Sequence, residues 1–146
     1  MAVSVGEARV EALYVDPSAL VRRYVHHVDR RLVLDTMADA DAWCGSALTH
    51  AECHLALRLL STHPDQHERL ASALRNDWDA FWVVPLDRRC LARAAQLGAQ
   101  FGLRTVDALH LAAADRLPRP VAYLTFDRRQ IPAATGLGFR VISPLA

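Results

Sequence analysis

The chain has 146 residues, of which 52% are hydrophobic and 23% charged, and its formal net charge is +1 at pH 7. This length suffices for one domain with a buried core, and the near-neutral charge indicates neither a basic nucleic-acid coat nor an acidic tail. All 17 basic residues are arginine. The absence of lysine excludes a P-loop and Schiff-base chemistry, because both need a lysine amine.

The cellular compartment is predicted from apolar runs and cysteines. No apolar run reaches the ~20 residues of a membrane helix, and the N-terminus lacks the order of charged then apolar residues typical of a signal peptide. Three cysteines without a CxxC pair are interpreted as reduced, buried thiols. We therefore expect a cytoplasmic protein without a membrane segment. These cysteines are Cys44, Cys53 and Cys90.

The first predicted elements are a strand and a helix joined at an acid. Residues 1–11 have no clear period and are predicted to be a flexible leader to a single domain that spans 1–146. The apolar stretch 13–15 predicts a strand that stops at Asp16, which suits an N-cap, and Pro17 suits the first helical position. The apolar side chains predicted to share one face of this helix are Leu20, Val21, Tyr24, Val25 and Val28.

Further along the chain, predicted helices alternate with predicted strands. Helices are expected over 30–38, from Thr49 to about 60, around 70–78, from Asp87 to Gly102, and over 104–114, whereas strands are expected over 43–47, 81–84, 121–126 and 139–142. This alternation predicts an α/β fold with a mainly parallel sheet of about five strands and helices on both faces. The inward face of the helix from Thr49 is predicted to consist of Ala51, Leu55, Leu59 and Leu60. The tryptophans at positions 43, 78 and 82 are predicted to pack in the core.

Four acidic residues occupy corresponding ends of these elements. Asp16 and Asp127 each end a predicted strand, while Glu52 and Asp107 each lie in the first turn of a predicted helix. In a parallel sheet, the strand C-termini and the following helix N-termini share one edge, so all four carboxylates are predicted to lie together. They would repel one another unless a cation compensates them. Mg²⁺ or Mn²⁺ suits such oxygen ligands and could polarise a phosphodiester and activate water.

Each acid also has a local explanation that needs no function. Asp16 and Asp107 can be helix caps, Glu52 can complement the helix dipole, and Asp127 can belong to a turn. The coincidence of all four on one edge favours the metal site. His110 is interpreted as a hydrogen-bonded or packing residue rather than a general base.

The residues around the four acids resemble the motifs of PIN-domain ribonucleases, in particular the VapC toxins of bacterial toxin–antitoxin pairs. The first motif is similar to Asp16-Pro17-Ser18-Ala19-Leu20, and the second to residues 46–49 followed by Glu52. The third and most specific resembles residues 103–112, Leu-Arg-Thr-Val-Asp-Ala-Leu-His-Leu-Ala. The closing segment resembles Thr125-Phe126-Asp127 with residues 138–144. The resemblance covers about residues 14–144, in the order of the family.

This resemblance implies a three-layer α/β/α PIN-like fold and an Mg²⁺- or Mn²⁺-dependent endoribonuclease. It implies Asp16, Glu52, Asp107 and Asp127 as the catalytic and metal-binding acids. Ser18 would orient a ligand or water near Asp16, and Thr125 would do so beside Asp127. It further implies RNA as substrate, a homodimer, and a small VapB-like antitoxin that covers the pocket.

Two questions stay open from the sequence. Asp115 lies two helical turns after Asp107 and competes with Asp127 for the fourth acidic position, although Asp127 is favoured because it ends a strand inside a matching motif. The alternatives to an endoribonuclease are a catalytically silent PIN-like binding or scaffold domain, and a nuclease that acts on another nucleic acid. Arginines near the predicted acidic edge are suited to phosphate contacts, and these are Arg22, Arg23, Arg104, Arg128 and Arg129.

Overall fold

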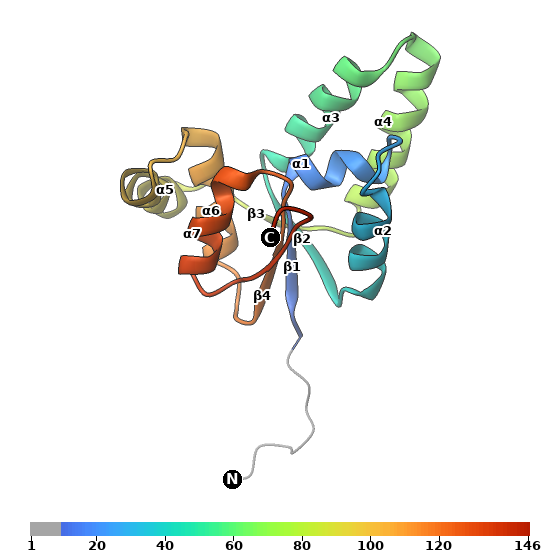
Figure 1. The fold of residues 1–146 in the computed structure, drawn as a ribbon. Coiled ribbons are helices and arrows are strands. Elements are labelled where there is room, and N and C mark those ends of the chain that lie inside the picture. Colours follow the sequence, from blue (N-terminus) through green and yellow to red (C-terminus); the bar gives the residue numbers. More distant parts are fainter. Residues whose placement is uncertain (1–9) are drawn as a thin grey trace.

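Five strands form one sheet in the order β3-β2-β1-β4-β5, and every neighbouring pair is parallel. The computed structural model describes residues 10–146, so residues 1–9 of the predicted leader lie outside the described part (Figure 1). The strands are β1 (Ala12–Val15), β2 (Ala42–Ser46), β3 (Trp82–Val84), β4 (Val121–Leu124) and β5 (Arg140–Ile142). The predicted parallel sheet is therefore confirmed.

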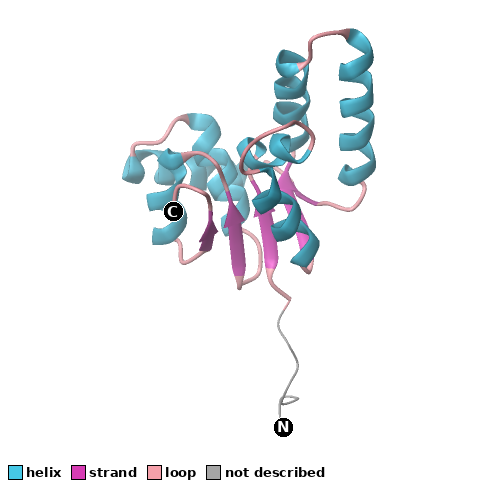
Figure 2. Ribbon diagram, turned by 45° about the vertical axis from the view of Figure 1, so that its right-hand side comes forward, coloured by secondary structure: helices cyan, strands magenta, loops and turns pink. Residues whose placement is uncertain are grey.

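Helices cover both faces of this sheet (Figures 1 and 2). One face carries α1 (Pro17–Leu20), the 3₁₀ turn η1 (Val21–Arg23), α2 (Arg30–Asp39), α3 (Thr49–Leu60) and α4 (Pro64–Trp78). The other face carries α5 (Arg88–Phe101), α6 (Thr105–Asp115) and α7 (Ile131–Gly136), the last preceded by the 3₁₀ turn η2 (Arg128–Gln130). The predicted three-layer α/β/α fold is thus confirmed.

The central strands are buried on both faces, as expected for a parallel sheet between two helical layers. All four residues of β1 and of β4 are buried. Their side chains alternate between the layers: Leu13 and Val15 belong to the core under α1–α4, whereas Tyr14 belongs to the core under α5–α7. Among residues 10–146, no helix combines the length and apolar character needed to cross a bilayer. The three cysteines are buried and unpaired, as predicted.

The predicted helix from Pro17 is shorter than its apolar spacing suggested. After one turn of α1 and the 3₁₀ turn η1, the helical stretch ends at Tyr24, and Val28 is 89% exposed. Beyond it, His27 Nδ1 accepts a hydrogen bond from the backbone N–H of Asp29 (3.0 Å). Such a local bond satisfies a backbone donor outside a helix.

The predicted inner face of α3 was wrong. Leu55, Leu59 and Leu60 are 59%, 87% and 54% exposed, and the side chains buried in this helix are those of Thr49, Cys53 and Leu57. Apolar residues lie on two faces of α3, so periodicity could not identify the face that meets the sheet. The prediction for Trp82 was also wrong, because it lies on the edge strand β3 and is 71% exposed.

Candidate active site

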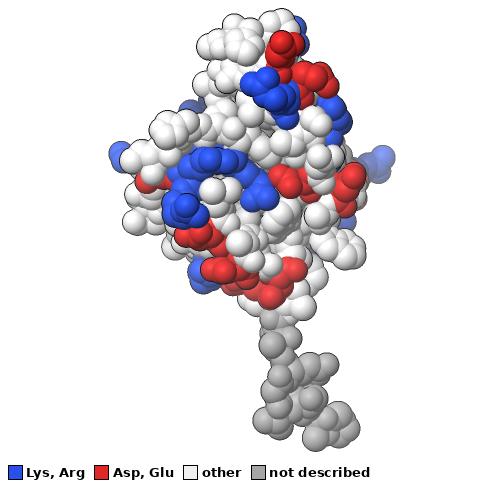
Figure 3. All heavy atoms as spheres, turned by 90° about the vertical axis from the view of Figure 1, so that its right-hand side faces the viewer, with Lys and Arg blue, Asp and Glu red and all other residues white. Residues whose placement is uncertain are grey.

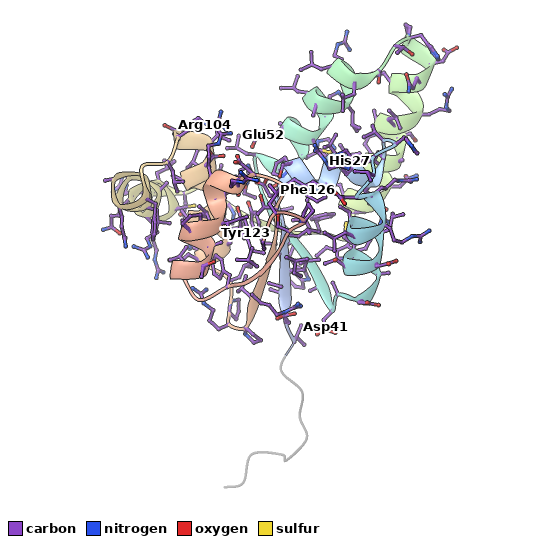
Figure 4. The ribbon with its side chains drawn as sticks, viewed as in Figure 1. His27, Asp41, Glu52, Arg104, Tyr123 and Phe126 are labelled. Atoms are coloured by element: carbon purple, nitrogen blue, oxygen red, sulfur yellow. The ribbon has the colours of Figure 1, made fainter. Side chains whose placement is uncertain are left out.

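The sheet order places β1 at a topological switch point. The chain crosses from β1 to β2 on one side, whereas β4 pairs on the other side, and open α/β sheets usually bind their ligands at the C-terminal ends of two such strands. Asp16 follows β1 and Asp127 follows soon after β4, while α3 and α6 begin at the same edge. Figure 4 shows Glu52 and Arg104 at this edge, with Asp41 at the opposite end of the sheet.

Asp16 is a buried carboxylate held by neutral donors. It caps α1 by accepting from the Ser18 backbone N–H (3.2 Å), and its Oδ2 also accepts from the hydroxyls of Ser18 and of Thr125 (3.3 Å). Burial raises the pKa of Asp16 above its ordinary value, against the opposing charge of His110 and the bond from Ser18. The Ser18 and Thr125 hydroxyls also accept from the backbone N–H groups of Phe126 and Asp127, which ties the ends of β1 and β4 together.

Asp107 is the second buried acid, and Gln130 joins it to Asp16. The Gln130 Nε2 group donates to Oδ1 of Asp107 (3.0 Å) and to Oδ1 of Asp16 (3.3 Å). The other oxygen of Asp107 accepts from Arg104 Nε (3.0 Å). Asp107 lies in the first turn of α6, as predicted, and the alternative explanation of this residue as a helix cap does not hold, because the N-cap of α6 is Arg104.

Asp127 lies at the rim, among arginines. Its carboxylate accepts from Nε and Nη2 of Arg129 (3.0 and 3.1 Å), and Arg104 Nη2 lies 3.8 Å from its Oδ2. Burial alone would raise the pKa of Asp127, but the hydrogen bonds and charge of Arg129, together with the charge of Arg104, lower it. Arg104 therefore spans Asp107 and Asp127 as Gln130 spans Asp16 and Asp107.

Glu52 approaches the same edge from α3 and contacts α6. Its Oε1 is hydrogen bonded to Nε2 of His110, which lies one turn after Asp107, and Nδ1 of His110 contacts the Tyr14 hydroxyl (2.7 Å). Glu52 is one-third exposed, whereas His110 is buried. The interpretation of His110 as a hydrogen-bonded residue is confirmed.

Asp115 does not lie with these acids. It is the last residue of α6, eight positions after Asp107, and at 1.5 Å per residue the two are ~12 Å apart along the helix. Its carboxylate is bound by Arg93 Nε (2.9 Å) and Arg119 Nη2 (2.7 Å). The structure thus removes Asp115 as a competitor of Asp127.

The donors of this edge match a hard divalent cation in type. They are carboxylate and hydroxyl oxygens, the ligands that Mg²⁺ and Mn²⁺ prefer. The neutral Gln130 amide lies between Asp16 and Asp107, whereas the Arg104 guanidinium lies between Asp107 and Asp127 and supplies positive charge there. With the side chains in these positions, no cluster of three or more His, Cys, Asp or Glu side chains within 10–146 has a metal-binding arrangement. Cation binding between Asp107 and Asp127 would therefore require Arg104 to give way.

Comparison with known proteins identifies the family. The model of the PIN domain matches residues 13–135. The chain belongs to the PIN domain family. Ribonuclease VapC46 of Mycobacterium tuberculosis is 34% identical over 134 residues, which cover 91% of this PIN domain and 98% of that protein. Ribonuclease VapC45 of the same organism is 29% identical over 134 residues, with 88% and 93% covered.

Solved structures share the fold of this PIN domain. FitAcB from Neisseria gonorrhoeae superimposes with a TM-score of 0.71 at 18% identity, covering 90% of this chain and 97% of that one. A toxin–antitoxin complex from Klebsiella pneumoniae superimposes with a TM-score of 0.66 at 19% identity, covering 92% and 98%. At these identities the likeness establishes the fold alone.

Sequence reasoning missed Gln130. It lies in η2, a short 3₁₀ turn between β4 and α7, where no apolar period or acidic motif marks it. In the structure Gln130 is only 2% exposed and its amide is hydrogen bonded to two acids, which distinguishes it from the glutamines usual on protein surfaces. A polar residue shortly after a strand-ending acid was the sole available signal.

Proposed function

We propose that this PIN domain is a divalent-metal-dependent endoribonuclease that acts as a growth-inhibiting toxin. The observation that carries the proposal is the joining of two buried acids, Asp16 and Asp107, at the switch-point edge, with Glu52 and Asp127 beside them. The names of the curated relatives, Ribonuclease VapC46 and VapC45, support RNA as the substrate.

Asp16, Glu52, Asp107 and Asp127 are the residues that would hold Mg²⁺ or Mn²⁺. When bound, the cation would polarise the scissile phosphodiester and lower the pKa of water. Asp16 and Asp107 supply fixed, buried negative charge, and the Ser18 and Thr125 hydroxyls orient Asp16. Glu52 and Asp127 are more exposed and face incoming substrate.

Arg22 is suited to hold an RNA phosphate next to these acids. Its guanidinium stacks on the Phe126 ring at 4.8 Å, donates to the Ser18 carbonyl (2.6 Å), and has an Nε atom that is buried without a partner. It borders a groove that Glu52 also lines. The positive charge of its guanidinium would attract a phosphate and offset the repulsion between the acids and an RNA backbone.

The same groove supports an antitoxin partner. It has a volume of about 390 Å³ and is lined largely by apolar groups of α1, η1 and α3, among them Val21, Ala56, Leu59 and Leu60. A VapB-like antitoxin could lay an apolar segment here and cover Glu52. Solved neighbours of the fold are toxin–antitoxin complexes.

We also infer a homodimer, for which exposed Trp82 and Leu91 supply apolar surface. The three free cysteines are consistent with a reducing, cytoplasmic compartment, which we infer as well.

The proposal is tested by incubating purified protein with a mixed RNA pool in Mg²⁺, in Mn²⁺ and in EDTA. Asp107→Asn should abolish cleavage and growth arrest, because the buried charge at the site is lost while its shape is kept. Asp115→Asn is the matched control, since it removes a carboxylate at the far end of the same helix, and it should keep full activity. Cleavage that persists in Asp107→Asn or in EDTA would overturn the proposal, and folded protein that cuts no RNA would favour a silent domain.

A further inference from the structure

Two stacked tyrosines lie directly beneath the acidic edge. Tyr14 of β1 and Tyr123 of β4 are paired in register, with ring centroids 5.3 Å apart and planes 1° from parallel. Both side chains are fully buried. Burial raises the pKa of both phenols above the ordinary value, so each remains a neutral O–H donor. A buried phenol needs an acceptor, and each of these contacts a different polar side chain that reaches the acids.

Tyr123 fixes the direction of the Gln130 amide. Its hydroxyl donates to Gln130 Oε1 (2.7 Å), so the NH₂ end faces the opposite way, toward Asp107 and Asp16. The reversed amide would place a carbonyl oxygen against two carboxylates and a donor against the phenol O–H. The hydrogen-bond network therefore assigns the orientation without ambiguity.

Tyr14 acts in the same way on His110. Its hydroxyl is 2.7 Å from His110 Nδ1, and His110 Nε2 contacts Glu52. An ionised carboxylate only accepts, so Nε2 carries the proton that faces Glu52. Because both ring nitrogens are bonded, the ring cannot turn without losing the contact with Tyr14 and the contact with Glu52.

We propose that His110 and Gln130 are positioning residues for the acids, and that the Tyr14–Tyr123 pair sets the direction in which each donates. The inference rests on the proposed metal-dependent function of this site. His110 orients Glu52, and Gln130 sets the spacing of Asp16 and Asp107.

The neutrality of the Gln130 amide explains its use between the two buried acids. An arginine or lysine would also hold the carboxylates but would cancel the negative charge that attracts a divalent cation. An amide holds the acids and leaves that charge in place. Arg104, in contrast, is charged, 62% exposed and able to withdraw into solvent.

The test compares Tyr14→Phe and Tyr123→Phe, each of which removes one oxygen and keeps the ring. Tyr24→Phe is the matched control: the Tyr24 hydroxyl also donates to a carboxylate, that of Asp77 (2.6 Å), between η1 and α4. Mn²⁺ affinity is measured by electron paramagnetic resonance without RNA. The side-chain ¹⁵N shifts of His110 are measured by NMR and assigned with His110→Gln. Thermal unfolding reports stability.

We expect Tyr14→Phe and Tyr123→Phe to weaken Mn²⁺ binding by about 10- to 100-fold, the usual effect of removing a group that orients a metal ligand. Tyr24→Phe should leave Mn²⁺ affinity unchanged, even if its melting temperature falls as much as those of Tyr14→Phe and Tyr123→Phe. Wild-type His110 should carry a proton at Nε2, which faces Glu52, and Tyr14→Phe should alter the ¹⁵N shifts of the ring. His110→Gln, which keeps a donor toward Glu52, should retain more Mn²⁺ affinity than His110→Ala.

Two results would overturn the proposal: unchanged Mn²⁺ affinity in folded Tyr14→Phe and Tyr123→Phe, or wild-type His110 protonated at Nδ1 alone. If either variant fails to fold, Gln130→Met and His110→Ala provide the same comparison, and equal affinity to wild type would again reject it. Failure of the proposed function is distinguishable. Protein that binds Mn²⁺ as expected but cuts no RNA rejects the nuclease and leaves the positioning roles standing, whereas absent Mn²⁺ binding rejects both.

Discussion

Arg104 occupies the place where a cation would be needed, so its removal should tighten metal binding. Its Nε is 3.0 Å from Asp107 Oδ2, and its Nη2 is 3.8 Å from Asp127 Oδ2. Arg104→Met keeps the aliphatic stem and removes the charge. In the metal-free protein, the two carboxylates then lose their compensating partner, and Mn²⁺ no longer has to displace it.

The magnitude follows from exposure. Because the Arg104 side chain is 62% exposed, each contact is worth the ~0.2–1 kcal/mol of a solvent-screened pair rather than that of a buried one. The longer contact, between Arg104 and Asp127, belongs at the low end of this range, so the two contacts together stabilise the metal-free protein by about 0.5–1.5 kcal/mol. At 1.4 kcal/mol per tenfold change, Arg104→Met should bind Mn²⁺ about 2- to 12-fold more tightly.

The assay is Mn²⁺ titration followed by electron paramagnetic resonance at low ionic strength, with thermal unfolding in parallel. The gain should shrink as salt is added, because exposed charges are screened. Arg75→Met is the control, since Arg75 pairs with Glu68 on α4 away from the acidic edge, and it should leave Mn²⁺ affinity as in wild type. Equal or weaker Mn²⁺ binding by Arg104→Met would refute the competition between the guanidinium and the cation.

Three further predictions concern other parts of the fold. Burial would raise the pKa of Asp115, but hydrogen bonds from Arg119 and Arg93 outweigh it and leave the pKa below its ordinary value. The two ion pairs of Asp115 therefore stabilise the fold above about pH 4, and this stabilisation is lost as pH falls through the lowered folded-state pKa. Asp115→Asn should thus lower the free energy of unfolding, measured by urea titration, by up to about 1 kcal/mol at pH 7 and leave it unchanged at strongly acid pH. An equal loss at both pH values would contradict this prediction. Leu59→Glu places a charge in the apolar groove and should weaken antitoxin binding at least tenfold in calorimetry; unchanged binding would move the partner elsewhere. Gly102 ends α5 in the left-handed region, with φ of 65°. Gly102→Ala should therefore lower the free energy of unfolding by about 1 kcal/mol, and Gly102→Asn should lower it by less. Equal losses in the two variants would show that strain of the left-handed backbone is not the cause.

Local sequence determined the elements and the edge at which the acids lie. β1 and β4 are short, fully buried apolar runs, and each leads directly into a polar segment that contains an acid, so the strand ends could be placed without knowledge of their neighbours. Asp87 and Gly102 mark both ends of α5 by capping chemistry that depends only on adjacent backbone. Parallel topology then predicts a common edge for Asp16, Glu52, Asp107 and Asp127, although their catalytic roles remain a proposal.

Tertiary structure alone decided which side chains join those acids. The buried face of α3 depends on which side meets the sheet, and a helix with apolar residues on two faces does not specify this. Gln130 and His110 acquire their roles from Tyr123 and Tyr14, which are 7 and 96 positions away in sequence. The arginines that bind Asp115, Arg93 on α5 and Arg119 after α6, come from other parts of the chain. Such pairings arise from the packing of segments distant in sequence, and no local pattern of residues encodes them.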